Sequence, residues 1–132
     1  MDATGSVVLD TSVVVDYLRK LDRKLMRQLE RAQDLYVPLV VLGELLYGAY
    51  KSNQREETLA DVKRFIGVCT LLVPGEITAD LYGQIKAGLA RQGTPIPQND
   101  IWIAALALEH KFPLATRDAH FSKVPGLTVL DW

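Results

Sequence analysis

Four acidic residues in this chain of 132 residues stand beside apolar sequence. Asp10 and Asp118 each follow a short apolar run, Glu44 interrupts an apolar stretch of helical spacing, and Asp100 precedes another. A charged carboxylate next to apolar side chains costs free energy unless it is paired or binds a cation. These four side chains are therefore the first candidates for chemistry.

Each of these acids also has an ordinary structural explanation. Asp10 can cap a helix together with the hydroxyl residues that follow it, and Asp118 can stabilise a turn. Glu44 can form a salt bridge with a neighbouring helix. Asp100 can be a favourable first-turn acid or a helix cap, with Asn99 as the alternative cap. Capping and function are compatible, because a residue at a helix start can do both.

Taken together, the four carboxylates predict a metal centre. If the strands are parallel, Asp10 and Asp118 emerge at one edge of the sheet, where helices that bring Glu44 and Asp100 also begin. Carboxylates that converge without comparable basic partners repel one another and need divalent cations to stay ionised. Ligation by oxygen alone suits Mg²⁺ or Mn²⁺ and not zinc. The single cysteine, Cys69, also excludes a zinc site built from several cysteines.

The elements that position these acids follow from hydrophobic spacing and from breaking residues. We expect strands at residues 7–9, 36–37, 69–73, 114–116 and 128–130. We expect helices at residues 13–21, 23–33, 40–50, 56–68, 78–91 and 99–110. Short apolar strands that alternate with helices predict an α/β fold. Its centre is a mostly parallel sheet of four to five short strands, with helices on both faces.

Composition sets wider limits. A length of 132 residues predicts one domain, and 48% apolar with 23% charged residues excludes intrinsic disorder. A net charge of −1 excludes a uniformly basic coat for nucleic acid, but six basic residues between Arg19 and Arg31 could still contact RNA phosphates. A solvated helix face explains these six equally well.

No signal for export or membrane insertion stands out. The stretch before Val7 lacks Lys and Arg, and Asp10 interrupts the first apolar run, which argues against a signal peptide. No segment approaches the ~18 apolar residues of a membrane span. We therefore expect a cytoplasmic protein with no membrane partner.

The chain resembles the PIN-domain nucleases, and within them the VapC-type toxins of toxin–antitoxin systems. The matching pieces are VLDTS at residues 8–12, LGELLYG at 42–48, NDIWIAA at 99–105 and LATRD at 114–118, with Phe121 and residues 124–127 behind them. The resemblance covers about residues 7–131. No single piece is specific, but four pieces in this order and spacing are.

The resemblance implies a PIN-like three-layer sandwich formed by residues 1–132. It implies an Mg²⁺- or Mn²⁺-dependent endoribonuclease that hydrolyses RNA phosphodiester bonds as the toxin of a type II toxin–antitoxin pair. Asp10, Glu44 and Asp100 match the three best-defined acids of the family as catalytic residues and metal ligands. Asp118 matches a fourth acid, which varies more within the family. A homodimer and a cognate antitoxin that covers the site are also implied.

Several residues are expected to support the acids. Thr11 and Thr116 match small hydroxyl positions near the family's site, and Asn99 is a further supporting position beside the third acid. Arg117 is a candidate for RNA binding because it adjoins Asp118. Two histidines are too sparse for a His-metal site. The second histidine of the chain, His120, is interpreted as a surface residue, with contact to substrate as the alternative.

An antitoxin helix is expected to lie across two helices near the acids. The expected cradle includes Val14 and Leu18 on the first helix and Leu46 on the helix of Glu44, although these residues could equally be core. Tyr47 and Tyr50 are the stronger candidates for antitoxin binding, because a tyrosine ring is apolar along its side and polar at its tip.

Two rival interpretations are non-catalytic. A phospho-receiver module has a similar size and alternation of strands and helices. It needs an acidic pair after its first strand and a phosphoacceptor Asp after a middle strand. Here the first strand offers Asp10 alone, and residues 69–73 are followed by Pro74 and Gly75. The second rival is a PIN-like protein that binds RNA without cleaving it.

Overall fold

The computed structural model describes residues 5–20 and 22–132, and the structural statements below refer to these residues. The strands are β1 (Ser6–Leu9), β2 (Asp34–Pro38), β3 (Thr70–Leu72), β4 (Leu114–Ala115) and β5 (Val129–Leu130). The helices are α1 (Thr11–Leu18), α2 (Arg23–Arg31), α3 (Leu39–Tyr50), α4 (Arg55–Ile66), α5 (Glu76–Gln92), α6 (Gln98–His110) and the short 3₁₀ helix η1 (Ala119–Lys123).

The strands form one sheet in the order β3-β2-β1-β4-β5, and every neighbouring pair is parallel. The predicted α/β fold is therefore confirmed, with five strands among the described residues and no antiparallel pair among them. Strand β1 lies at the centre of the sheet, and its register with β4 pairs Val8 with Leu114 and Leu9 with Ala115. These residues are completely buried, as expected for parallel strands that are covered on both faces.

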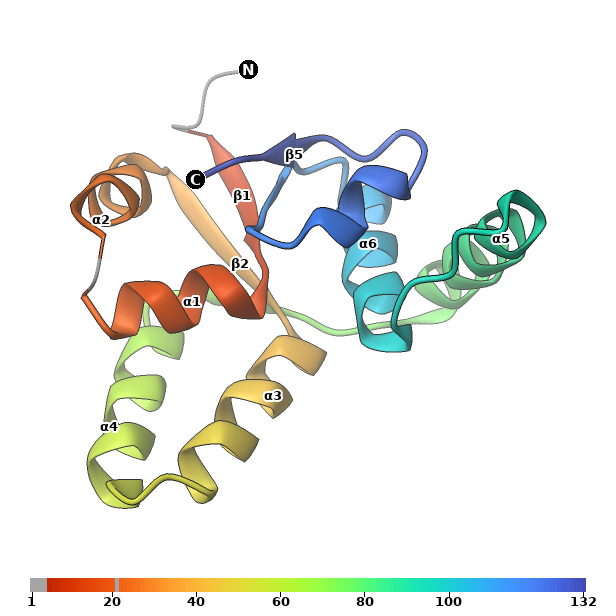
Figure 1. Cartoon of the computed structure of the whole chain (residues 1–132). Coiled ribbons are helices and arrows are strands. Elements are labelled where there is room, and N and C mark those ends of the chain that lie inside the picture. The colour runs from red at the N-terminus through yellow and green to blue at the C-terminus, as the bar shows by residue number, and fades with distance from the viewer. Residues whose placement is uncertain (1–4, 21) are drawn as a thin grey trace.

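The order of the strands reverses direction at β1. From β1 the chain moves to β2 and β3 on one side, whereas β4 and β5 lie on the other side of β1. Because such crossovers are right-handed, helices α1–α4 cover one face and α5 and α6 the other. Figure 1 shows α1, α2 and α4 on the left of the strands and α5 and α6 on the right. The carboxyl ends of β1 and β4 thus border a topological switch point, where α/β sheets bind ligands.

Helix α6 is apolar nearly all round and packs against α5 and α3. Its residues Ile101 and Ile103–Ala107 are buried. This burial holds the N-terminal turn of α6, which carries Asp100, in a fixed position near the switch point. Within residues 5–20 and 22–132, no helix joins the length and the apolar character that crossing a membrane requires.

The first helix is shorter than its apolar pattern predicts. Helix α1 ends at Leu18, and Lys20 has a φ of 56°, in the left-handed region. A residue in that region cannot continue a right-handed helix. The predicted helical position Leu21 and residues 1–4 lie outside the described residues.

Other helix and strand boundaries differ from the predicted ones by one or two residues. Helix α5 begins at Glu76, earlier than predicted, because the backbone N–H of Gly75 donates to Thr78 Oγ1 over 3.0 Å. Helix α4 ends at Ile66, and Gly67 caps it. Strand β4 stops before Thr116, whose side chain turns to the site described next. None of these shifts changes which elements meet at the switch point.

Candidate active site

The four predicted acids come from four different elements that meet at the switch point. Asp10 follows β1 and Asp118 lies beyond the end of β4. Glu44 lies in the middle of α3, and Asp100 lies in the first turn of α6. Helix α3 packs against both α1 and α6, and η1 packs against α6. The fold therefore gathers these segments in one region.

Asp10 is held by three donors. Its Oδ1 accepts a hydrogen bond from the backbone N–H of Thr11 over 2.8 Å, so it caps α1. Its Oδ2 accepts bonds from Ser12 Oγ over 3.1 Å and from Thr116 Oγ1 over 2.7 Å. The residue is only 5% exposed. Capping and the candidate function are thus combined in one rigid carboxylate.

Thr11 connects the first two acids. Its backbone N–H donates to Asp10, and its hydroxyl donates to Glu44 Oε1 over 2.9 Å. Glu44 takes part in none of the ion pairs found among the described residues, so the salt-bridge alternative has no support there. The half-buried carboxylate of Glu44 is instead turned toward α1.

Asp100 is a first-turn acid and not a cap. Helix α6 begins at Gln98, and its N-cap position is Pro97, which makes no side-chain capping bond. The alternative in which Asn99 or Asp100 caps the helix is therefore wrong. Asn99 is exposed, whereas the side chain of Asp100 is only 14% exposed and turns toward η1.

His120 lies between two of the acids. Its Nδ1 is 3.2 Å from Asp100 Oδ2 and 3.0 Å from Asp118 Oδ1. Its backbone N–H also donates to Asp118 Oδ1 over 2.9 Å, because Asp118 caps η1. The ring is 44% exposed, as expected for a surface residue, but its contacts with two of the acids were not predicted. Its position two residues after Asp118 is the signal that could have found it.

The most compact donor group consists of Asp100, Asp118 and His120. One ligand atom from each residue lies within 4.8 Å of the others. Burial and, to a smaller extent, the charges of Asp10 and Asp118 raise the pKa of Asp100, while the hydrogen bond to His120 lowers it, and the net result is a pKa of about 6. Two neighbouring carboxylates that raise the pKa of a third are the mark of an acidic cluster. Besides the predicted carboxylate oxygens, this group contains an imidazole nitrogen, which was not predicted from the sequence.

Arg117 faces away from this cluster. Its guanidinium pairs with Asp16 over 3.3 Å, pairs with Asp22, and donates to the carbonyl of Trp132 over 2.6 Å. Hydrogen bonding to Arg117 lowers the pKa of Asp22. The guanidinium thus joins α1, the segment before α2 and the C-terminus. RNA binding by Arg117 stays a prediction.

A groove leads away from Glu44 between α1, α3 and α4. Its volume is about 490 Å³, and its lining includes Val15, Leu18, Arg19, Glu44, Gly48 and Val62. Tyr47 and Tyr50 are 67% and 56% exposed on α3. Val14 is completely buried, so its expected place in the cradle is wrong, whereas Leu18 and Leu46 are half-buried.

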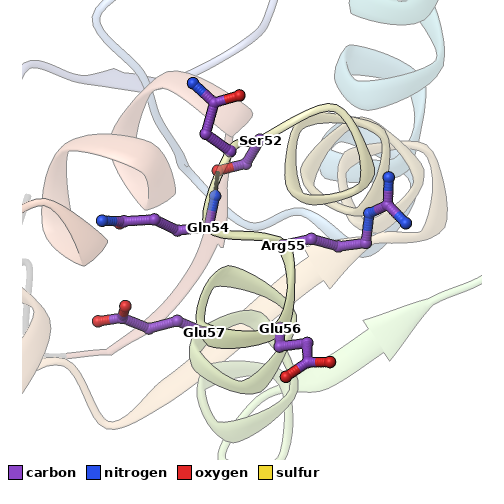
Figure 2. Close-up of a pocket in the computed structure, with 6 residues that line it drawn as sticks. Ser52, Gln54, Arg55, Glu56 and Glu57 are labelled. Atoms are coloured by element: carbon purple, nitrogen blue, oxygen red, sulfur yellow. Dashed lines mark hydrogen bonds between the residues drawn. The ribbon is translucent and has the colours of Figure 1, made fainter.

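A second hollow lies at the turn between α3 and α4. Figure 2 shows Gln54, Arg55, Glu56 and Glu57 diverging from it, and the dashed line marks the hydrogen bond that the backbone N–H of Gln54 donates to Ser52 Oγ over 3.0 Å. Side chains that diverge cannot surround a ligand. The switch point is therefore the better candidate for chemistry.

Comparison with known proteins agrees with this geometry. The family model of the PIN domain matches residues 7–127. The chain is 31% identical over 127 residues to Ribonuclease VapC2 of Haemophilus influenzae, and 32% identical over 127 residues to the tRNA(fMet)-specific endonuclease VapC of Shigella flexneri. Each alignment covers 95% of this chain and 96% of the relative.

A solved structure extends the likeness to three dimensions. The DNA-bound VapBC of Salmonella typhimurium contains a chain that is 30% identical to this one, with a TM-score of 0.91. The match covers 96% of this chain and 98% of that chain. From its fold, its PIN-domain match and these relatives, the chain belongs to the PIN-domain family, and within it to the VapC ribonuclease toxins of VapBC toxin–antitoxin systems.

Proposed function

We propose that residues 1–132 form a single PIN-type nuclease domain, an Mg²⁺- or Mn²⁺-dependent endoribonuclease in which Asp10, Glu44, Asp100 and Asp118 hold the metal. The observation that carries this proposal is the cluster at the carboxyl ends of β1 and β4, where one donor atom from each of Asp100, Asp118 and His120 lies within 4.8 Å of the others. Burial and the charges of Asp10 and Asp118 raise the pKa of Asp100 there. A divalent ion relieves such repulsion.

The donor set fits a hard divalent ion. It consists of carboxylate oxygens and one imidazole nitrogen, and the only thiol, Cys69, donates to the carbonyl of Phe65 elsewhere in the fold. When bound, the ion lowers the pKa of water to give a nucleophile near neutral pH, and it neutralises charge on the phosphate.

The residues around the acids keep the donors in place. The three donors on Asp10 fix both of its oxygens, so this carboxylate acts as the rigid part of the site. Thr11 sets the orientation of Glu44, and the N-terminal turn of buried α6 presents Asp100. These residues position the ligands; they do not themselves react with RNA.

The substrate is proposed to be a structured RNA, with tRNA as the first class to test. The relative from Shigella flexneri is named as an endonuclease specific for tRNA(fMet). In this chain, all six basic residues from Arg19 to Arg31 are exposed along the end of α1 and on α2. They offer a surface for phosphates outside the site.

The partner is proposed to be an antitoxin that lies in the groove between α1, α3 and α4. The groove begins at Glu44, which invites a basic side chain. Tyr47 and Tyr50 are exposed on the same helix, α3, outside the lining of the groove. The similar structure from Salmonella typhimurium is a VapBC complex. A homodimer stays a prediction, which sedimentation of the purified protein tests.

Cleavage of end-labelled RNA tests the enzymatic part. The protein should cut selected tRNAs with Mg²⁺ or Mn²⁺ and should stop when EDTA is added. Asp10→Asn and Asp118→Asn should be inactive, whereas Asp34→Asn, an exposed acid at the opposite end of the sheet, should cut normally. Cutting that persists in EDTA contradicts metal dependence. RNA binding without any product favours the non-cleaving alternative.

A further inference from the structure

We propose that His120 is a nitrogen ligand of the metal centre, through Nδ1, and that it shifts the preference of the centre from Mg²⁺ toward Mn²⁺. The inference rests on the proposed function, in which the neighbouring carboxylates hold a divalent ion. It adds a residue of a different chemical type to the four predicted acids.

The first support is the spacing of the donors. In an octahedral site, neighbouring ligands are separated by about 1.4 times the metal–ligand distance, which gives roughly 3 Å for bonds of about 2.1 Å. His120 Nδ1 lies 3.0 Å from Asp118 Oδ1 and 3.2 Å from Asp100 Oδ2. The nitrogen and the two oxygens thus already have the spacing of adjacent ligands.

The second support is that the backbone of His120 is anchored on both sides. The backbone N–H of His120 donates to Asp118 Oδ1, and the next residue, Phe121, is completely buried in the core. The backbone of η1 therefore cannot carry the imidazole away without moving a core aromatic ring. The ring is presented from a fixed place, as a ligand must be.

The third support is the hydrogen-bond count. A single ring nitrogen carries at most one proton, yet His120 Nδ1 faces carboxylate oxygens of both Asp100 and Asp118. One N–H is thus shared between two charged acceptors. A divalent ion interacts with both carboxylates and with the nitrogen lone pair at once.

The ring determines the choice of ion. Mg²⁺ is bound in proteins through carboxylates, phosphates and water, whereas imidazole is a common ligand of transition-metal ions. A nitrogen in the coordination sphere therefore adds affinity for Mn²⁺ and adds less for Mg²⁺. With oxygen ligands alone, the chain would lack this source of discrimination.

The test is pulsed EPR of the full chain loaded with Mn²⁺, in the absence of RNA. The chain has only two histidines, so labelling with ¹⁵N-histidine marks His110 and His120 alone. We expect an imidazole nitrogen coupling that changes to the ¹⁵N pattern on labelling. It should persist in His110→Gln, whose ring lies near Glu109 at the far end of α6, and disappear in His120→Phe.

Ion affinities give the second readout. Titration of His120→Phe should show Mn²⁺ affinity lowered by about tenfold and Mg²⁺ affinity lowered by less than about threefold. Because the ring of His120 is 44% exposed, its replacement should leave the fold intact, and circular dichroism of each variant checks this. Equal losses for both ions overturn the assigned ion preference.

Two failures can be told apart. If Mn²⁺ binds and Asp100→Asn abolishes its binding, but no imidazole coupling is seen, then His120 is not a ligand and the proposed function stands. If Mn²⁺ does not bind, or binds Asp100→Asn as tightly as the parent chain, the proposed metal-dependent function itself is overturned.

Discussion

The carboxyl group of Asp100 is under opposing influences. Burial in the first turn of α6 and the charges of Asp10 and Asp118 raise its pKa, and the hydrogen bond to His120 lowers it, with a result of about 6. An unfolded chain gives Asp a pKa of about 3.9. Because the folded pKa is the higher one, this group stabilises the fold fully below pH ~4 and loses that contribution as the pH rises through about 6.

Asp100→Asn should therefore change stability in a pH-dependent way without metal. At pH 7.5 the variant should be more stable than the parent chain, by on the order of 1 kcal/mol after allowance for solvent screening. Near pH 4 the difference should vanish. Urea unfolding in EDTA across this range measures it.

The control for this experiment is Asp34→Asn, which removes an exposed charge at the start of β2. Asp100→Asn should also lose RNA cleavage at saturating Mg²⁺ while remaining folded. A stability difference between Asp100→Asn and the parent chain that stays constant with pH would contradict the raised pKa.

Among the elements, helix α3 carries candidate residues for two different roles. Glu44 turns toward α1 through Thr11, while Tyr47 and Tyr50 are exposed on the same helix without lining the groove. Residues three apart on a helix lie on neighbouring parts of its surface. The helix therefore places a candidate metal ligand next to candidate antitoxin contacts.

Tyr50→Ala should weaken binding of the antitoxin by about 1–3 kcal/mol if the ring is an anchor, and should leave RNA cleavage intact. Tyr47→Ala should act in the same direction. Titration of the purified antitoxin against each variant measures the change. Val68→Ala, an exposed apolar residue beyond α4, is the matched control. If the antitoxin binds the parent chain and all of these variants with equal affinity, the two tyrosines of α3 are not part of its binding surface.

Arg117 joins elements rather than lining the acidic cluster. Its contacts reach Asp16 in α1, Asp22 before α2 and the carbonyl of Trp132 at the C-terminus. The guanidinium holds the pKa of Asp22 below its ordinary value, so this pairing stabilises the fold at neutral pH and the contribution is lost as the pH falls through that lowered pKa.

Arg117→Gln should accordingly lower the melting temperature at pH 7 by a few degrees. At pH 3 the difference in melting temperature between the variant and the parent chain should be smaller. Thermal melts at pH 7 and pH 3 measure both values. Arg64→Gln, which breaks the exposed pair with Asp61, is the control and should have little effect. An unchanged melting temperature together with weaker RNA binding would instead support a direct contact of Arg117 with RNA.

The whole molecule should respond to divalent ions through mass action. An ion that binds only the folded state at 100 times its dissociation constant stabilises that state by about 2.7 kcal/mol. For a chain of this length, the melting temperature should rise by roughly 10 °C. Differential scanning fluorimetry with Mn²⁺ or Mg²⁺ measures the shift, which should be small in Asp10→Asn. If millimolar Mn²⁺ or Mg²⁺ leaves the melting temperature of the parent chain unchanged, the result would contradict a metal site.

The sequence alone was sufficient for the strands, the helices and the positions of the four acids. Each of these features depends on neighbours within about one turn or one strand, such as the apolar run that ends at Asp10. Parallel strands then bring their carboxyl ends to one edge, so the gathering of Asp10 and Asp118 also followed from the pattern. The motifs in order indicated the family in the same way.

Tertiary structure alone decided which side chains meet across long stretches of chain. Thr116 reaches Asp10 over a separation of 106 residues, and His120 reaches Asp100 over 20. The guanidinium of Arg117 turns to Asp22, although its neighbour in sequence faces the acids. Such contacts depend on the packing of whole elements and on rotamers within it, which local spacing does not specify. For that reason the four acids could be predicted, and the imidazole nitrogen beside Asp100 and Asp118 could not.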